Sequence, residues 1–503
     1  MGTDGPPGSP SIGSPQVIIR APRHLGAPVR ILLVQSYLGR KGVADLLVFP
    51  LGLACIATAL EAAGHTPRIV DLNVGDGDPW LRLADAIRDF HPDAVGVSLR
   101  NIDSTTRKAP HVYHIFLRPA LEVIRREAPG VPTFLGGPGF TQAAGTFMAR
   151  YPYDYGIQAE GEAALVHLLS NLQHPDQVPG TWWRDGDTVR YSGDPVLPDF
   201  AALPFPRRHH VDWEPYRLEH RTRGLLLDVG IESTRGCPRR CAYCNYPFLN
   251  GRHLRCKPAE VVGEEIAYLQ RDFDVRQFTF TDSRFNERPD HARAICEEIL
   301  RRDLKVRWIA WLGFKQLDAD FLRLMRRAGC FRVAFSPDGL LQPSLDRMQK
   351  DTTTREIMDS IRAVRKAGGL KASWSFFCTP PSSSPKEQAA LAALYLYLQG
   401  SLAGRGRMVL TWCRVEEGTR FAEIAREDGF LTGNEDLLPE DPADLERLFY
   451  IPPGHEQWSQ RWDRFLDAEM GARTLAGRVT APLRRFGFRD LTPAHLRGQP
   501  PKK

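Results

Sequence analysis

The chain has 503 residues, a formal net charge of +6, 42% hydrophobic residues and 25% charged residues. This composition fits a globular protein with two or three cores and excludes a disordered or membrane-embedded chain. The charge is small and the basic residues are scattered, which argues against a nucleic-acid-binding protein. Nine cysteines, unevenly spaced, form no disulfide framework and favour a reducing compartment. Because the N-terminus lacks a basic-then-apolar leader pattern, we expect a cytoplasmic protein.

The N-terminal third alternates between strand and helix patterns after a tail. Residues 1–28 are rich in Pro, Gly and Ser and predict a disordered tail. Residues 29–175 then predict strands at 30–34, 67–72, 94–98 and 131–135, and helices at 53–63, 80–90 and about 121–127. This alternation predicts an α/β fold, a doubly wound, Rossmann-like parallel sheet covered on both faces. Such sheets bind ligands at the carboxyl ends of their strands.

Two of these strand ends carry the residues that we expect to bind a ligand. Ser98-Leu99-Arg100-Asn101 follows the third strand, and Gly136-Gly137 follows the fourth. Glycines there let a flat ligand or a nucleotide tail lie against the backbone. With the glycines near both ends of the first helix, Gly52 and Gly64, this pattern resembles a cobalamin-binding domain. The resemblance implies that cobalamin contacts the six residues Ser98, Leu99, Arg100, Asn101, Gly136 and Gly137.

The loop after the first strand departs from one branch of that family. Cobalamin domains of the methionine synthase kind carry Asp-x-His-x-x-Gly there, whereas residues 35–49 contain no histidine. His65 lies at the far end of the first helix and is interpreted as a helix-end residue. The resemblance therefore implies no nitrogen ligand beneath the cobalt. Our hypothesis is that Arg100 and Asn101 lie near the lower face of the cobalt. The alternative for Arg100 is an ordinary salt bridge with Asp103.

Residues 176–222 are rich in Pro, Trp and Arg and are predicted to be an interdomain linker. We expect the neighbouring His209 and His210 to lie on its surface. Adjacent side chains usually point apart, so no metal role is predicted for this pair.

Residues 223–430 repeat the alternation six times. Strands are expected at about 225–233, 277–281, 306–311, 332–336, 372–377 and 408–412, with helices at about 258–271, 289–301, 318–328, 353–367 and 386–398. Six such units predict a partial (β/α)6 barrel with its active site at the carboxyl ends of the strands. Residues 431–503, with Trp458, Trp462 and the basic stretch 484–489, predict a small helical C-terminal region whose charges form a solvated face.

Three cysteines directly follow the first barrel strand. Cys237, Cys241 and Cys244 have the spacing C-x3-C-x2-C. Three thiolates can hold an iron-sulfur cluster and leave one iron open for a ligand from outside the protein. The alternative is a zinc loop, for which His253 or Cys256 is a candidate fourth ligand.

This motif, with an aromatic residue before the third cysteine, resembles the radical S-adenosylmethionine (SAM) superfamily. The resemblance implies that Cys237, Cys241 and Cys244 bind a 4Fe-4S cluster, that SAM chelates its open iron and that Tyr243 lies against the adenine. It also places SAM contacts at strand ends, where Asp282, Ser336 and Asp338 are candidates; turn formation and helix capping are their alternative roles. The family's Gly-x-Pro-Gly-Glu turn is replaced here by residues 377–382.

Two further cysteines, Cys378 and Cys413, follow barrel strands, and we expect either to contact substrate or to relay a hydrogen atom. The single cysteines Cys55, Cys256, Cys296 and Cys330 are interpreted as small apolar residues.

Together the two resemblances imply a cobalamin-dependent radical SAM methyltransferase. It would transfer a methyl group from SAM, via methylcobalamin, to a carbon of a small molecule, such as a natural-product intermediate. One alternative is a rearrangement, cyclisation or epimerisation that uses the same cofactors. Another is a cobalamin carrier or sensor without catalysis. The expected partners are the substrate and an electron donor such as flavodoxin or ferredoxin, with neither nucleic acid nor membrane.

Overall fold

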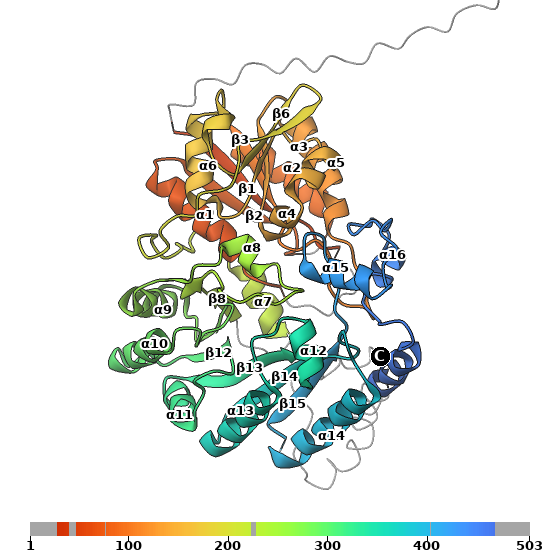
Figure 1. Ribbon diagram of the computed structural model, residues 1–503. Coiled ribbons are helices and arrows are strands. Elements are labelled where there is room, and N and C mark those ends of the chain that lie inside the picture. The colour runs from red at the N-terminus through yellow and green to blue at the C-terminus, as the bar shows by residue number, and fades with distance from the viewer. Residues whose placement is uncertain (1–27, 40–46, 76, 223–227, 403, 468–503) are drawn as a thin grey trace, which may run out of the picture.

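The computed structural model describes residues 28–39, 47–75, 77–222, 228–402 and 404–467. Two β-sheets, each flanked by helices, lie one above the other, and two short helices from residues 420–446 lie beside their junction (Figure 1). Within the described ranges, we find no helix with the length and apolar character that crossing a membrane requires. The predicted tail, the start of the first barrel strand and the basic stretch 484–489 lie outside the described residues.

The N-terminal lobe, residues 30–191, is built on a seven-stranded sheet with the order β2-β1-β3-β4-β5-β6-β7. Its first five strands are parallel, whereas β6 and β7 are antiparallel and complete one edge. The strands are β1 (Arg30–Gln35), β2 (Thr66–Asp71), β3 (Ala94–Ser98), β4 (Thr133–Gly136), β5 (Tyr155–Ile157), β6 (Thr181–Asp185) and β7 (Thr188–Tyr191). The β6–β7 hairpin lies in the segment predicted to be a linker, so the sheet continues past residue 175.

Helices cover both faces of this sheet, which confirms the doubly wound prediction. Alternating side chains of β1 explain why: Ile31 and Leu33 pack with α1 and α6, and Leu32 and Val34 with α2 and α3. The helices are α1 (Leu51–Ala62), α2 (Pro79–Phe90), α3 (Leu117–Glu127), α4 (Pro138–Gln142), α5 (Ala144–Arg150) and α6 (Gly161–Ser170), with short 3-10 turns η1 (His114–Phe116) and η2 (Pro175–Gln177).

The barrel, residues 228–411, has six parallel strands in the order β15-β14-β13-β12-β11-β8. This confirms the partial barrel. The strands are β8 (Asp228–Ile231), β11 (Gln277–Phe280), β12 (Arg307–Trp311), β13 (Cys330–Asp338), β14 (Lys371–Phe377) and β15 (Gly406–Thr411). The covering helices are α9 (Ala259–Phe273), α10 (Pro289–Arg301), α11 (Ala319–Arg327), α13 (Thr354–Ala367) and α14 (Pro385–Ser401).

Local chemistry explains where the barrel helices begin. Thr353 and Glu356 form a reciprocal capping box at the start of α13, and Ser384 caps α14 just before its first residue, Pro385. Trp308 and Trp374 are fully buried, and their indole N–H groups donate to the Ala328 carbonyl and the Ser360 hydroxyl. These pairings fix the helix layer to the sheet and leave the strand ends free to form a site.

Short elements complete the connections and the C-terminal region. Beside the cysteine motif, two strands of two residues each pair in antiparallel fashion. One helix, α7, precedes the barrel, and the helices that follow the barrel are short. The elements are α7 (Glu214–Thr222), β9 (Thr234–Arg235), α8 (Tyr246–Asn250), β10 (Arg255–Cys256), α12 (Gln342–Arg347), α15 (Arg420–Glu427), α16 (Pro442–Glu446) and a helix over residues 456–467. The described part of the C-terminal region is thus helical, as expected, and α15 and α16 lie beside the junction (Figure 1).

Candidate functional site

A cavity of about 250 Å³ lies at the carboxyl ends of the barrel strands. The three motif cysteines all line it, although they come from a loop and not from a strand. Side chains from the ends of three strands form the opposite wall. The lining includes Cys237, Cys241, Cys244, Tyr243, Ser283, Arg284, Trp311, Phe314, Ser336, Asp338 and Lys350. We call this space the mouth cavity.

The cysteine loop fits an iron-sulfur cluster that keeps one iron open. Three thiols converge on one space, and no fourth cysteine or histidine is among the residues that line it. His253 and Cys256, the candidates for a fourth zinc ligand, are not in that lining. Gly236 makes the loop possible, because its φ is +90° and a Cβ there would lie 2.1 Å from the His253 carbonyl oxygen. That the three cysteines bind the cluster stays a prediction.

Asp282 lies beneath this loop and not in the mouth cavity. Its Oδ1 accepts hydrogen bonds from the backbone N–H groups of Ser233 and Thr234 at 2.8 and 2.9 Å, and its Oδ2 accepts one from the Ser233 hydroxyl at 2.5 Å. Burial raises the pKa of Asp282 to about 6, against the effect of these hydrogen bonds. The side chain therefore holds the loop, and its position does not support the predicted contact with SAM.

A group of three polar side chains forms one wall of the mouth cavity. The Tyr243 hydroxyl donates to Oδ2 of Asp338, and Nζ of Lys350 donates to both of these oxygen atoms. Burial, followed by the Asp338 charge, raises the pKa of Tyr243. Asp338 has a φ of +63° beside a register shift in β13, which turns Ser336 and Asp338 toward the cavity.

Lys350 was missed by the sequence analysis. It lies in the loop between α12 and α13, away from any strand end, and nothing in its local pattern distinguishes it from a surface lysine. Its side chain is only 5% exposed, however, and buried lysines are almost always paired. The structure thus adds one positive charge to the wall that carries Asp338.

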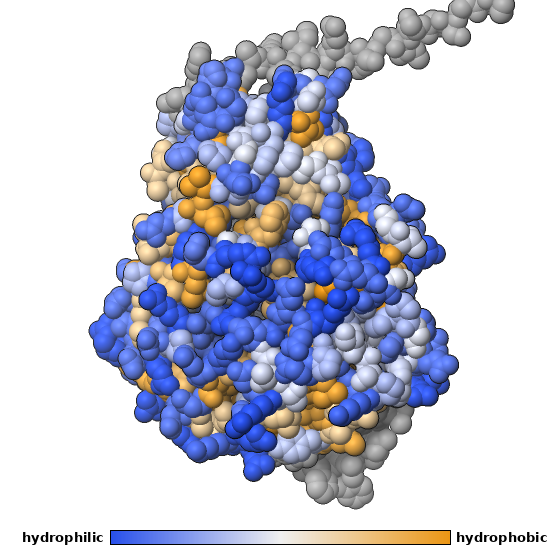
Figure 2. Space-filling model, viewed as in Figure 1, coloured by the Kyte–Doolittle hydropathy of each residue, from blue (hydrophilic) through white to orange (hydrophobic). Residues whose placement is uncertain are grey.

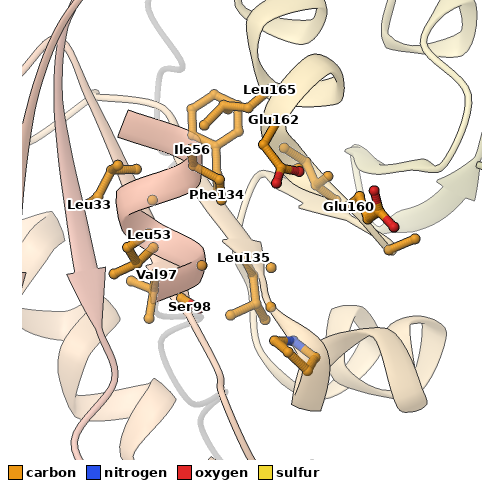
Figure 3. Close-up of a pocket in the computed structure, with 18 of the residues that line it drawn as sticks. Leu33, Leu53, Ile56, Val97, Ser98, Phe134, Leu135, Glu160, Glu162 and Leu165 are labelled. Atoms are coloured by element: carbon orange, nitrogen blue, oxygen red, sulfur yellow. The ribbon is translucent and has the colours of Figure 1, made fainter. Parts of the chain in front are cut away.

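A second cavity, of about 170 Å³, lies at the carboxyl edge of the N-terminal sheet. Figure 3 shows apolar side chains of the strands and of α1 around it, with the carboxylates of Glu160 and Glu162 to one side. Glycines 52, 96, 136, 137 and 161 from separate segments also line it, so the space exists where side chains would otherwise fill it. A narrow, mostly apolar slot of this kind fits the flat nucleotide base of cobalamin. We call it the lobe cavity.

The residues predicted to contact cobalamin divide into two groups. Ser98, Gly136 and Gly137 line the lobe cavity, whereas Leu99, Arg100 and Asn101 do not. Leu99 is fully buried and joins the two strand-end loops, because its N–H donates to the Gly136 carbonyl and its carbonyl accepts from the N–H of Gly139, both at 2.8 Å. Leu99 therefore supports the pocket from behind. Cobalamin contacts from all six residues stay predictions.

Two other residues that the sequence analysis discussed in connection with the cobalt face are Asp103 and His65. Asp103 pairs with Arg414, which follows β15 of the barrel, and it also accepts a hydrogen bond from the N–H of Thr105 in its own loop. His65 accepts a hydrogen bond from the N–H of Val29 at 3.3 Å, just before β2. That is the amino edge of the sheet, opposite the lobe cavity, which agrees with its interpretation as a helix-end residue.

An ion network missed by the sequence analysis closes one end of the lobe cavity. Arg235, the last residue of β9 just before the cysteine loop, forms ion pairs with Glu160 at 3.0 Å, Glu162 at 2.7 Å and Glu232 at 2.8 Å. Arg255 also bonds to Glu160. Glu160 and Glu162 belong to the lobe, and the arginines belong to the cysteine loop region, so this network fixes the two cavities relative to each other.

A third cavity, of about 650 Å³, lies between the other two. It shares Ala159 with the lobe cavity and Cys241 and Cys244 with the mouth cavity. Its lining includes four arginines, Arg239, Arg240, Arg252 and Arg420. Figure 2 shows strongly hydrophilic side chains across this face, at the level where the two sheets meet. We call it the central cavity.

Cys378 and Cys413 are not part of this arrangement. Cys378 is fully buried and Cys413 is 5% exposed, and neither lines the lobe, central or mouth cavity. Burial raises the pKa of both thiols far above the usual range. Both side chains pack into apolar clusters, which does not support contact with substrate, and a catalytic role for either cysteine stays a prediction.

Comparison with known proteins agrees with this geometry. Residues 39–169 match the B12 binding domain, and residues 231–392 match the Radical SAM superfamily. The chain is 24% identical over 346 residues to an uncharacterized methyltransferase of Pyrococcus horikoshii, covering 68% of this chain and 72% of the relative. It is 27% identical over 333 residues to the anaerobic magnesium-protoporphyrin IX monomethyl ester cyclase of Cereibacter sphaeroides, covering 63% of this chain and 52% of that one.

The fold also matches a solved structure. The radical SAM methyltransferase TsrM of Kitasatospora setae, with cobalamin and a [4Fe-4S] cluster bound, superposes with a TM-score of 0.70 at 21% identity, over 85% of this chain and 82% of that chain. The chain thus carries a B12-binding domain followed by a radical SAM domain, with a cavity at the carboxyl edge of each sheet.

Proposed function

We propose that the chain is a radical SAM methyltransferase that carries a methyl group from SAM, by way of cobalamin, to a carbon atom of a small molecule. The observation that carries this proposal is the central cavity, which shares lining residues both with the lobe cavity and with the cysteine-lined mouth cavity. When bound, the corrinoid supplies the methyl group, and the cluster with SAM supplies the radical chemistry that an unactivated carbon requires.

The role of the protein's own residues in this proposal is to bind the cofactors and to orient them. Cys237, Cys241 and Cys244 would hold the cluster, and the lobe cavity would hold the nucleotide end of cobalamin. Tyr243, Asp338 and Lys350 would line the SAM site, where their mutual hydrogen bonds fix each side chain before SAM arrives. The ion network around Arg235 and Glu160 holds the lobe against the barrel.

The likeness to a methyltransferase of Pyrococcus horikoshii supports methyl transfer. The likeness to a cyclase supports a second candidate, a cyclisation that uses the same cofactors. The proposal also includes a cytoplasmic location and an external electron donor such as flavodoxin or ferredoxin. The sequence holds one cluster-binding motif, so the reducing electron would come from another protein.

The test uses full-length protein reconstituted anaerobically with iron, sulfide and cobalamin. It is given SAM labelled at the methyl group and a pool of candidate metabolites, and the products are identified by mass spectrometry. Methyl transfer predicts labelled product together with S-adenosylhomocysteine. Deoxyadenosine without S-adenosylhomocysteine would instead indicate cyclisation or rearrangement, and neither nucleoside would indicate a carrier.

Two cysteine variants test whether turnover depends on the cluster. The Cys237→Ala, Cys241→Ala, Cys244→Ala triple variant is expected to lose both iron and turnover. Cys256→Ala, at a half-buried cysteine outside the mouth cavity, is expected to keep both. Turnover by the triple variant would contradict the proposed function.

A further inference from the structure

Two adjacent histidines and one glutamate converge at the amino edge of the N-terminal sheet. His209 Nε2 lies 3.2 Å from Glu61 Oε1, and His210 Nε2 lies 3.3 Å from Glu61 Oε2. The two imidazole rings are 4.0 Å apart between centroids. The three ligand atoms, one from each residue, lie within 4.8 Å of one another. The expectation that adjacent side chains point apart is therefore wrong here.

A β-turn explains the convergence. The N–H of Val211 donates to the Arg208 carbonyl at 3.3 Å, so His209 and His210 occupy the two central positions of the turn. Side chains at these positions can leave the same side of the backbone, unlike neighbours in a strand. The last turn of α1 places Glu61 in front of both rings.

The separations of the ligand atoms leave room for one metal ion. A tetrahedral ion with ligand bonds of about 2.0–2.1 Å holds its ligand atoms about 3.3–3.4 Å apart. The contacts of 3.2 and 3.3 Å have about that length, each to a different oxygen of Glu61, and one ligand atom from each of the three residues lies within 4.8 Å of the others. Two imidazoles and a carboxylate are also a ligand set that suits zinc.

The surroundings hold these ligands in place. Arg208, the first residue of the turn, is fully buried and pairs with Glu265 of α9 at 2.6 Å. The N–H of Arg207 donates to the Thr58 hydroxyl of α1 at 2.7 Å. The turn is thus anchored to the barrel on one side and to the lobe on the other, so the site would exist before the ion binds.

We propose that Glu61, His209 and His210 form a binding site for a divalent transition metal ion of the Zn²⁺ class. The ion ties the segment that joins the two sheets to α1. It is separate from the chemistry, because none of the three residues lines the lobe, central or mouth cavity. Its effect is on the stability of the junction between lobe and barrel.

The test measures zinc bound by full-length protein whose cluster has been reconstituted, so that iron occupies the motif cysteines. Equilibrium dialysis against Zn²⁺ alone, followed by metal analysis, is expected to give one equivalent in the wild type. That equivalent is lost in the His209→Ala, His210→Ala double variant. It is also lost in Glu61→Gln, which keeps the hydrogen-bonding shape but removes the anionic ligand.

Controls keep the result interpretable. His174→Ala removes an exposed histidine outside this group and is expected to retain the zinc equivalent. Iron content and the far-UV circular dichroism spectrum report folding of every variant. Zinc is also expected to raise the thermal unfolding midpoint of the wild type and not that of Glu61→Gln. A wild type that binds no zinc at micromolar free Zn²⁺, or a folded double variant that still binds it, overturns the proposal.

Discussion

Nε of Arg414 donates to Oδ2 of Asp103 at 2.9 Å, and both side chains are only 4% exposed. Asp103 follows β3 of the lobe, and Arg414 follows β15 of the barrel. The Arg414 guanidinium also donates to the Leu437 carbonyl at 2.7 Å. A buried ion pair therefore joins the carboxyl edges of the two sheets, the edges that carry the cofactor cavities.

Removal of one partner of this pair should be costly. Asp103→Ala leaves the buried guanidinium of Arg414 without its counter-charge, which typically costs about 3–5 kcal/mol of unfolding free energy. The urea midpoint should fall accordingly, measured by tryptophan fluorescence. The control is Asp89→Asn, which breaks an exposed pair with Arg68 and should cost less than about 1 kcal/mol. Equal losses of unfolding free energy in the two variants would show that the Asp103–Arg414 pair does not stabilise the contact between the sheets.

Lys350 should matter for SAM and not for the cluster. Lys350→Gln leaves the buried Asp338 carboxylate without its cation and removes the ammonium group that fixes Tyr243 and Asp338 in the wall of the mouth cavity. We expect SAM to bind about tenfold more weakly, or about 1.4 kcal/mol, by equilibrium dialysis. Iron content should stay at the wild-type level. Lys315→Gln, at a half-exposed lysine paired with Asp351, should leave SAM binding unchanged.

Gly137 is expected to tolerate no side chain. Its φ is +96°, and a Cβ would lie 2.7 Å from both the Leu99 carbonyl oxygen and the Ser98 hydroxyl. Gly137→Ala should therefore lower the thermal unfolding midpoint and reduce the amount of cobalamin retained after gel filtration. Gly186→Ala is the matched control, because φ there is also positive, at +60°, but a Cβ would meet nothing within 4 Å. Full retention of cobalamin by Gly137→Ala would contradict this account of the loop.

Glu416 should make stability depend on pH. Burial raises its pKa from 4.5 to about 7, and the Asn245 amide donates to the carboxylate. The folded state therefore binds more protons than the unfolded state between these values, and this contribution to stability is lost as pH rises from about 4.5 to about 7. The loss is on the order of 3 kcal/mol.

Urea unfolding at pH 5 and pH 8 checks this expectation. Glu416→Gln cannot titrate, so its stability should fall less than that of the wild type between the two values. Glu417→Gln, at the exposed neighbouring position, should behave like the wild type. A wild-type difference that persists in Glu416→Gln would assign the pH dependence to another group.

Much of the barrel could be predicted because its signals are local. Strand and helix periodicity placed β12, β13, β14 and β15 within a few residues of their observed positions. The short strands β6 and β7 were missed, since prolines after them suggested a linker and an antiparallel edge needs only four or five residues. Cys378 and Cys413 were assigned to the mouth from their place after strands, but strand position alone does not say which way a side chain points.

By itself, the sequence determined the alternation of strands and helices, the cysteine spacing and the glycines at strand ends, because each depends on residues close together in the chain. Only the tertiary structure decided that Lys350 meets Tyr243 and Asp338, that Arg235 meets Glu160, and that Glu61 faces His209 and His210. These partners are up to 149 residues apart in the sequence. Their meeting depends on how the packed sheets bring distant segments together, which no local pattern records.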